Sequence, residues 1–253
     1  MARKEDYIAV FDSGVGGISV LKELMALMPG EKYLYFGDSA NAPYGDRPTA
    51  QVRQLTLAAA DMLMKRGIKA LVVACNTATA AAIQDLRAAY PETIIIGIEP
   101  ALKLAYDRYP AGRVGVMATQ VTLREEKFSH QLERFPDMQV SLIPAPGLVE
   151  LIEAGKADSE ETENLLRLLL RPYVGKLDAL VLGCTHYPFV KATVAKILGD
   201  QTELLDGSLG TARHTMHRLE EKGLLLGGEG CLQIENSAND PQLIALAAKL
   251  LEK

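Results

Sequence analysis

Short apolar runs rich in β-branched residues alternate along the chain with stretches whose apolar residues have helical spacing. The runs, interpreted as strands, are residues 7–11, 33–36, 70–74, 93–98, 113–117, 139–143 and 178–182. Between them, apolar stripes predict helices, as at Leu21, Leu24, Met25 and Met28. Because such alternation builds parallel sheets covered by helices on both faces, the sequence predicts an α/β fold with mainly parallel sheets.

The chain also resembles itself at a nearly constant offset. Residues 8–13 (IAVFDS) are similar to residues 114–119 (VGVMAT), 106 positions later, and Cys184 lies 109 positions after Cys75. This spacing favours two similar α/β domains, although any α/β protein repeats apolar strands. We predict a first domain of residues 1–98 plus about 207–253 and a second of residues 99–206, with a crossing at residues 98–100.

Helix signals in the second half supplement this division. Asp158 with Glu161 predicts a helix start, and Pro172 predicts its end. Residues 211–222 and 241–251 also have helical patterns, and this last segment could fold back on the first domain.

Bulk composition narrows the class of function. Apolar residues make up 48% of the 253 positions, no run is long enough for a membrane span, and the N-terminus lacks a signal-peptide core. The net charge of −5 carries no basic tract, so we expect no nucleic-acid partner and no membrane partner. Three cysteines suit a reducing compartment, which predicts a cytoplasmic protein acting on a small molecule.

Unusual polar residues follow three of the predicted strands. The segments are residues 12–17 (DSGVGG), 37–45 (GDSANAPYG) and 75–79 (CNTAT). Ligands collect beyond the carboxyl ends of parallel strands, and closely spaced glycines let backbone amides approach an anion. These loops suit a carboxylate as well as a phosphate.

A dinucleotide-binding fingerprint is the main rival interpretation of the same loop. Gly14 and Gly16 after a strand, with Asp38 ending the next strand, imitate that pattern. However, Ser19 replaces its third glycine, and Asp12 stands where the pyrophosphate would approach.

Two cysteines occupy matching settings, since Cys75 and Cys184 each end an apolar run and continue into hydroxyl, amide or imidazole residues. A free cysteine is often an apolar filler, as we take Cys231 to be. A pair at equivalent strand ends instead indicates two reactive thiols serving one site. A zinc site with His186 is a further alternative, but no metal-binding spacing supports it, so we predict no metal.

Acid–base partners for these thiols can be named. His186 lies two residues after Cys184 and could deprotonate it or bind a substrate carboxylate. Asp12 could serve Cys75 in the same way, or act as a helix cap. His130, His214 and His217 lie in polar helical stretches and are expected to be solvated.

Four motifs together resemble those of bacterial glutamate racemase. They are residues 11–17 (FDSGVGG), 37–45 (GDSANAPYG), 74–79 (ACNTAT) and 182–188 (LGCTHYP), which occur in this order. The resemblance covers most of the chain and is weakest over residues 124–172 and after residue 211. It implies two pseudo-symmetric α/β domains with the active site at their interface, and a likeness to the wider aspartate/glutamate racemase superfamily.

The resemblance also implies a cofactor-independent isomerase that interconverts L- and D-glutamate for peptidoglycan synthesis, and a homodimer. Cys75 and Cys184 would then be the two bases, with Asp12 and His186 as helpers. A helper glutamate is also implied, for which Glu153 fits best and Glu150 competes. The short N-terminus lacks the extension of members activated by a cell-wall precursor, so no such dependence is expected.

Racemisation at a carbon beside a carboxylate requires preorganised hydrogen-bond donors. The predicted substrate-binding residues share a position in the four motifs or at the equivalent strand end, and are Asp12, Ser13, Pro43, Tyr44, Gly45, Asn76, Thr77, Thr119, Thr185 and His186. Helix N-termini are expected after both cysteines, where they would favour thiolates. A racemase of aspartate or another acidic amino acid, and a non-catalytic small-anion-binding protein, remain alternatives.

Overall fold

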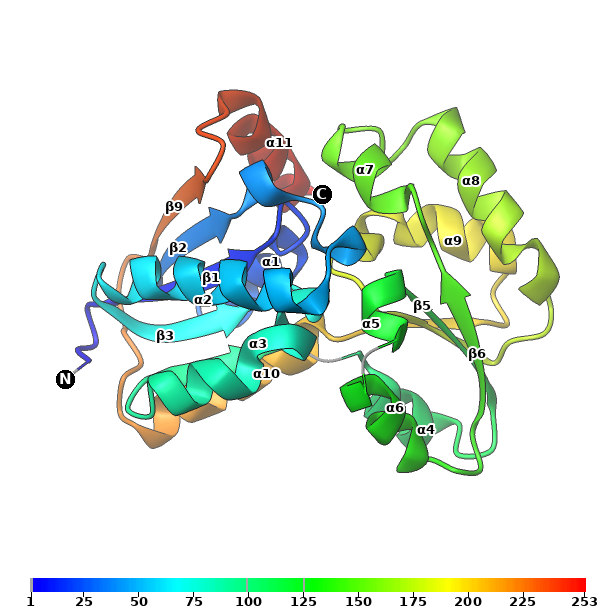
Figure 1. Ribbon diagram of the computed structural model, residues 1–253, viewed down its shortest axis with the longest axis horizontal. Coiled ribbons are helices and arrows are strands. Elements are labelled where there is room, and N and C mark those ends of the chain that lie inside the picture. Colours follow the sequence, from blue (N-terminus) through cyan, green and yellow to red (C-terminus); the bar gives the residue numbers. More distant parts are fainter. Residues whose placement is uncertain (1, 99, 125) are drawn as a thin grey trace.

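The computed structural model describes residues 2–98, 100–124 and 126–253 and contains two separate sheets flanked by helices (Figure 1). The first sheet has the order β4–β3–β1–β2–β9, formed by β1 (Tyr7–Asp12), β2 (Lys32–Gly37), β3 (Ile68–Val73), β4 (Ile94–Gly97) and β9 (Cys231–Asn236). The second has the order β6–β5–β7–β8, formed by β5 (Arg113–Ala118), β6 (Gln139–Pro144), β7 (Ala179–Leu182) and β8 (Glu203–Asp206). Every pairing between the described strands is parallel, which confirms the predicted α/β class.

The two sheets share one topology. Their first four strands in chain order are arranged 2-1-3-4, as β2–β1–β3–β4 and as β6–β5–β7–β8. The strand order reverses beside the first strand of each sheet, and the loops after the first and third strands therefore diverge and leave a crevice. The two cysteines predicted to be reactive, Cys75 and Cys184, each follow the third strand of their own sheet.

Two helical layers cover the first sheet. One contains α1 (Ile18–Leu27), α10 (Ser208–Glu221) and α11 (Pro241–Glu252), and the other contains α2 (Thr49–Met64) and α3 (Asn76–Ala89). Because side chains alternate across a strand, Ile8 and Val10 pack on the α1 side while Ala9 and Phe11 pack on the α2 side. Short 3₁₀ turns follow β2, η1 (Ser39–Asn41) and η2 (Tyr44–Asp46).

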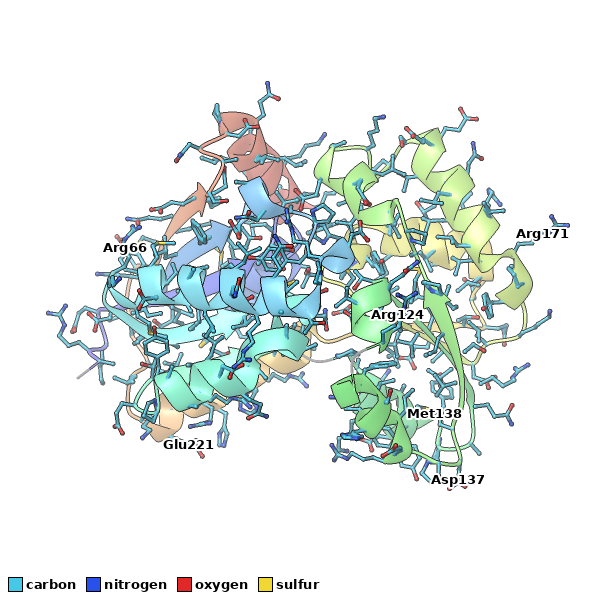
Figure 2. All side chains as sticks on the ribbon, viewed as in Figure 1. Arg66, Arg124, Asp137, Met138, Arg171 and Glu221 are labelled. Atoms are coloured by element: carbon cyan, nitrogen blue, oxygen red, sulfur yellow. The ribbon has the colours of Figure 1, made fainter. Side chains whose placement is uncertain are left out.

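The second sheet is covered in the same way. Its helices are α4 (Leu102–Arg108), α5 (Gln120–Arg124), α6 (Glu126–Glu133), α7 (Leu148–Glu153), α8 (Glu160–Leu170) and α9 (Lys191–Leu198), with the 3₁₀ turns η3 (Arg171–Tyr173) and η4 (Tyr187–Val190). Leu180 and Leu182 of β7 pack with residues of α7, α8 and α9, whereas Ala179 and Val181 face the opposite layer. Charged side chains such as Arg66, Arg171 and Glu221 project from the periphery (Figure 2).

The structure differs from the predicted elements at a few places. Strands β8 and β9 were not predicted, because β8 (ELLD) has only two apolar residues and the edge strand β9 contains polar residues such as Gln233. Helix α8 begins one residue later than predicted, since the side chain of Ser159, not Asp158, accepts the N–H of Thr162. The predicted crossing at residues 98–100 includes residue 99, which lies outside the described residues.

A buried ion pair joins segments near the amino ends of the first sheet. The Lys69 Nζ lies 2.5 Å from the Glu31 Oε2, and both side chains are almost wholly buried. Lys69 also donates to the carbonyl oxygens of Lys4 and Leu224, while the Glu31 Oε1 accepts the N–H of Leu226. The pair thereby holds the N-terminal segment and the connection to β9 against the sheet.

Among the described residues, no helix is long and apolar enough to cross a membrane.

Candidate active site

The two buried cysteines line one small cavity between the sheets. Its lining includes Ser13, Pro43, Tyr44, Gly45, Cys75, Asn76, Thr77, Thr119, Val149, Gly183, Cys184, Thr185 and His186. The structure therefore brings together the predicted residues of both halves of the chain. Asp12 and Glu153 do not line the cavity but lie behind it, where they contact lining residues.

Cys75 is held at the start of α3 and serves as its N-cap. Its Sγ accepts the N–H of Ala78 at 3.4 Å and lies 3.6 Å from the Ser13 hydroxyl. Burial, followed by the charge of Asp12, raises the pKa of Cys75 to about 12, although these two contacts oppose the shift. Cys75 therefore carries its proton at neutral pH.

Cys184 has a different set of partners. Its Sγ lies 3.6 Å from the Nδ1 of His186, whose Nε2 lies 2.6 Å from the Glu153 Oε1. Burial alone would lower the pKa of His186, but hydrogen bonds to Cys184 and Glu153 outweigh it and raise this pKa well above its usual range. The Cys184 sulfur therefore lies in contact with a positively charged imidazole.

The predicted α-helix N-terminus after Cys184 is absent from the structure, whereas the one after Cys75 is present. Cys184 is followed by a turn and the short 3₁₀ segment η4, and α9 begins only at Lys191. The imidazole of His186 is thus the local positive group at this sulfur, in place of a helix dipole.

Asp12 is wholly buried and connects the two domains. Its carboxylate accepts the N–H of Gly14 and the hydroxyl of Thr185, each at 3.0 Å. Burial raises the pKa of Asp12, whereas the positive charge of His186 and the two hydrogen bonds lower it. Ser13, rather than Asp12, makes the direct contact with the Cys75 sulfur.

The glycine-rich loop binds a carboxylate of the protein itself. The backbone N–H of Val15 donates to the Glu153 Oε1 at 2.8 Å. A Cβ atom on Gly14 would clash with the Glu153 carboxylate, and one on Gly16 would lie 2.5 Å from the Thr185 Oγ1. These glycines therefore permit the second domain to approach, which accounts for the pattern that imitates a dinucleotide fingerprint.

Three threonine hydroxyls form a triangle across the domain interface, here called the threonine triangle. The Oγ1 atoms of Thr77 and Thr119 are 3.3 Å apart, those of Thr77 and Thr122 are 3.4 Å apart, and Thr119 donates to Thr122 at 3.1 Å. Thr77 belongs to α3 of the first sheet's helices, while Thr119 and Thr122 follow β5 of the second sheet.

Other polar groups shape the cavity. The Tyr44 hydroxyl donates to the buried Asp38 carboxylate at 2.6 Å, which fixes the loop that carries Gly45. Among the residues that the structure describes, the buried Oδ1 of Asn76 has no hydrogen-bond partner. A buried oxygen of this kind accepts a hydrogen bond from a ligand donor at low cost.

The remaining candidates lie elsewhere. Cys231 is exposed at the start of β9, so it is not a core filler, and His214 and His217 are on the surface of α10. His130 is exposed near the end of α6. In the part of the chain that the structure describes, no three His, Cys, Asp or Glu side chains are grouped to hold a metal ion.

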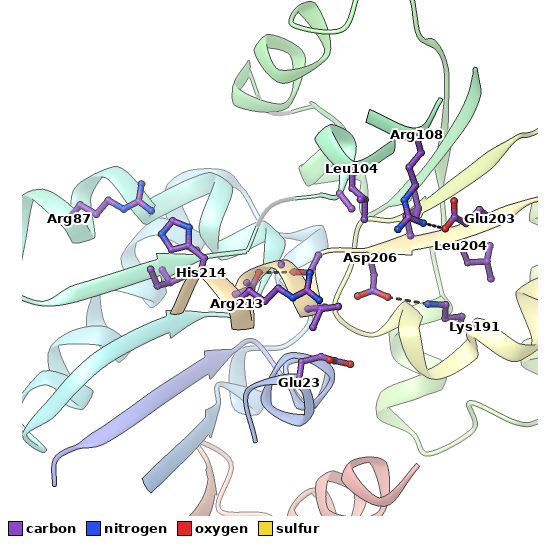
Figure 3. Close-up of a pocket in the computed structure, with 18 residues that line it drawn as sticks. Glu23, Arg87, Leu104, Arg108, Lys191, Glu203, Leu204, Asp206, Arg213 and His214 are labelled. Atoms are coloured by element: carbon purple, nitrogen blue, oxygen red, sulfur yellow. Dashed lines mark hydrogen bonds and ion pairs between the residues drawn. The ribbon is translucent and has the colours of Figure 1, made fainter. Parts of the chain in front are cut away.

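A larger pocket of about 720 Å³ lies between the domains beside Gly207 (Figure 3). It is lined by charged and polar residues that include Arg213, His214 and Asp206, and the Lys191 Nζ lies 3.4 Å from the Asp206 carboxylate. None of the predicted site residues lines it.

Comparison with known proteins identifies the family. The model of the Asp/Glu/hydantoin racemase family matches residues 18–215. The chain belongs to this family. The match covers β2 to β8, which includes strands of both sheets, and it contains both Cys75 and Cys184.

Individual members of the racemase family are similar over nearly the whole chain. A glutamate racemase from Clostridium perfringens is 47% identical over 249 residues, covering 97% of this chain and 96% of the relative. A crystal structure of a glutamate racemase isoform from Bacillus anthracis has a TM-score of 0.90 at 29% identity, covering 99% of this chain and 96% of that chain. A Francisella tularensis glutamate racemase solved in complex with D-glutamate has a TM-score of 0.87 at 28% identity, covering 99% and 95%.

Sequence reasoning missed three residues at or beside this racemase-family cavity. Val149 and Gly183 line it, and Thr122 supports it from behind. Gly183 immediately precedes Cys184 and was within reach of motif analysis. Val149 and Thr122 carry no sequence signal, because only the packing of α7 and α5 brings them to the site.

Proposed function

We propose that this protein interconverts L- and D-glutamate by two-base proton transfer between Cys75 and Cys184, without a cofactor, and supplies D-glutamate for peptidoglycan. The observation that carries the proposal is the placement of these two buried thiols, each after the third strand of its own sheet, on one cavity. Membership of the racemase family and the full-length similarity to glutamate racemases support it.

Each direction of the reaction exchanges the states of the two thiols. A thiolate at Cys184 removes the α-proton of one enantiomer and becomes a thiol, leaving a carbanion. The Cys75 thiol gives its proton to the opposite face of that carbon and becomes a thiolate. The reverse reaction begins from the Cys75 thiolate and restores the first state.

The electrostatics of the cavity suit one of these starting states. The pKa of Cys75 raised to about 12 keeps that sulfur protonated and ready to donate. The raised pKa of His186 keeps an imidazolium in contact with the Cys184 sulfur. Glu153 orients that imidazole through the 2.6 Å contact and is its helper in this proposal.

Polar groups of the cavity are proposed to bind the amino acid. The unpartnered Asn76 Oδ1 is suited to accept a hydrogen bond from the ammonium group. Ser13, Thr77, Thr119 and Thr185, with the backbone amides of Tyr44 and Gly45, are the donors for the two carboxylates and for the charge that develops in the transition state.

Substrate entry requires the domains to separate. The cavity volume is only about 20 Å³, roughly the space of one water molecule. We infer that glutamate enters an open form and that closure then excludes water, which strengthens the electrostatic interactions at the reacting carbon.

Deuterium incorporation tests the reaction directly. Incubation of the protein in heavy water with L- or D-glutamate should yield the opposite enantiomer carrying deuterium at the α-carbon. Absence of label from either enantiomer would overturn racemisation and favour a small-anion-binding protein, and labelling of aspartate in preference to glutamate would favour the other acidic substrate.

Separate serine replacements test the two-base assignment. Cys75→Ser and Cys184→Ser should each lower racemisation at least ~10³-fold, since each face loses its proton carrier. Cys231→Ser is the matched control, because this third cysteine is exposed and remote from the cavity. Full activity in either of the first two variants would refute the mechanism.

We further propose domain boundaries at residues 1–98 with about 207–253, and at residues 99–206. The pairing of β9 with β2 and of β8 with β7 supports this division. We also propose a cytoplasmic homodimer, a state that sedimentation analysis of the purified chain would test. The free state of all three cysteines agrees with a reducing compartment.

A further inference from the structure

The threonine triangle contains one member that does not reach the substrate cavity. Thr77 and Thr119 line the cavity, whereas Thr122 does not, lines a neighbouring small pocket and is 2% exposed. Its hydroxyl nevertheless lies within hydrogen-bond distance of both lining hydroxyls. Thr122 is therefore placed to act on the ligand only through Thr77 and Thr119.

Proton counting determines how the closed triangle is bonded. Each hydroxyl has one proton to donate, and Thr119 gives its proton to Thr122. All three contacts are hydrogen bonds only if Thr122 donates to Thr77 and Thr77 donates to Thr119. In this ring every hydroxyl proton is used internally, so none is directed at the cavity.

A carboxylate in the cavity changes this balance. Ionised carboxylates only accept hydrogen bonds, and charge-assisted bonds are roughly twice as strong as those between neutral hydroxyls. The protons of Thr77 and Thr119 therefore turn toward the carboxylate, and the ring opens. The Thr122 hydroxyl keeps a partner by donating to one of these two oxygens.

We propose that Thr122 is a positioning residue that commits the Thr77 and Thr119 hydroxyls to donate to a substrate carboxylate. Two acceptor sites behind the cavity are filled by Thr122, one by its hydroxyl and one by its backbone N–H, which lies 3.3 Å from the Thr119 Oγ1. An O–H···O–H···O⁻ chain also polarises the terminal donor and strengthens its bond. Without the Thr122 hydroxyl, this polarisation is lost and one of the two acceptor sites is left unfilled.

The triangle also couples this site to domain closure, because its members come from α3 and from the segment after β5. The Thr77 hydroxyl meets Thr119 and Thr122 only when the two domains are together, whereas Thr119 and Thr122 are paired within the second domain. A carboxylate bound in the closed form therefore meets two oriented hydroxyls, whereas the open form presents them separately.

Steady-state kinetics of Thr122→Val and Thr122→Ser test the inference, which rests on the proposed glutamate racemisation. Valine keeps the shape and removes the hydroxyl, so KM for both enantiomers should rise ~10-fold while kcat stays within about threefold, as expected for an interaction made equally in the ground and transition states. Serine keeps the hydroxyl and should restore KM to within about twofold of the parent. An unchanged KM in Thr122→Val, or an equal loss in Thr122→Ser, would refute the positioning role.

Calorimetric titration with glutamate separates this inference from the proposed function. A parent protein that binds glutamate but does not racemise it would sink the proposed function alone, and weaker binding by Thr122→Val would still support the positioning role. A parent that binds no glutamate would sink both. If Thr122→Val does not fold, Thr122→Ala removes the same hydroxyl and is compared with Thr122→Ser in its place.

Discussion

The Oε1 of Glu153 lies 2.6 Å from the Nε2 of His186, and the same oxygen accepts the backbone N–H of Val15 from the other domain. Burial by itself raises the pKa of Glu153, but the hydrogen bond and charge of His186 and the Val15 N–H outweigh it, and the net shift is downward. The carboxylate therefore stays ionised and sustains the imidazolium next to Cys184.

Removing this carboxylate should move the alkaline side of the pH–rate profile. The raised pKa of His186 means that its imidazolium is present at low and neutral pH and is lost as pH rises through the raised value. Glu153→Gln removes one cause of the elevation, so activity should fall off at a lower pH, with kcat reduced by ~10-fold or more near neutrality.

Glu150→Gln provides the contrast, since Glu150 is exposed in the same helix and was the competing candidate for the helper. Profiles of kcat/KM from about pH 6 to 10 make the comparison. An alkaline limb that moves in Glu150→Gln and not in Glu153→Gln would reassign the helper.

Adding a methyl group to the glycine-rich loop should separate the domains. Alanine at Gly16 would place its Cβ 2.5 Å from the Thr185 Oγ1 and against the His186 ring, so we expect kcat/KM to fall at least ~100-fold. The matched control is Gly210→Ala inside α10, where an added Cβ meets nothing within 4 Å.

For the control, a helical Gly→Ala change should leave activity intact and stabilise the fold by up to ~1 kcal/mol. Near-normal kcat/KM in Gly16→Ala would show that the second domain does not depend on this close approach.

The Cys75 thiol should make stability fall in alkali. Its pKa is raised to about 12 by burial and by Asp12, against roughly 8.5 for an unfolded-chain thiol. This contribution is fully present below the unfolded value and is lost as pH rises toward the folded one. By pH 10 the loss amounts to ~2 kcal/mol.

Urea unfolding of the parent and of Cys75→Ser at pH 8 and pH 10 measures that contribution. Serine does not titrate in this range, so the parent should lose more free energy of unfolding than the variant between the two values. Equal losses would show that the folded thiol ionises as easily as the unfolded one.

The Lys69–Glu31 ion pair should matter for folding and not for the reaction. Glu31→Gln leaves the Lys69 ammonium buried without its counter-charge and should cost ~3–5 kcal/mol of unfolding free energy. Its kcat should remain within about twofold of the parent, because the pair lies at the amino ends of the strands and the cavity at the carboxyl ends. A normal stability with reduced kcat would contradict this separation.

Most of the strand framework could be predicted from periodicity alone. The seven predicted strands all occur. Most are apolar runs buried on both faces or nearly so, whereas the edge strand β6 buries only Ile143. Strand β9 escaped prediction because Gln233 and Glu235 interrupt its apolar pattern at an exposed sheet edge. Edge strands owe their pairing to a neighbour, here β2, which a local pattern does not reveal.

The sequence also predicted many of the residues that lie together at the site. Motif residues that end strands lie together because parallel strands point their carboxyl ends to one side. The bond between Val15 and Glu153 joins positions 138 residues apart, so nothing local to either residue signals it. The same applies to Thr122, whose role depends on how α5 packs against α3.

The shared 2-1-3-4 strand order has a consequence for how the two mirror-image forms of an amino acid are treated. Because each cysteine follows the third strand of its own sheet, Cys75 and Cys184 occupy equivalent positions in the two halves. Exchanging one enantiomer of the substrate for the other therefore exchanges the roles of the two cysteines. The two cysteines nevertheless have different neighbours, Ser13 beside Cys75 and His186 beside Cys184. The two thiols thus occupy equivalent positions in unequal surroundings, so we expect the two enantiomers to differ in their kinetics.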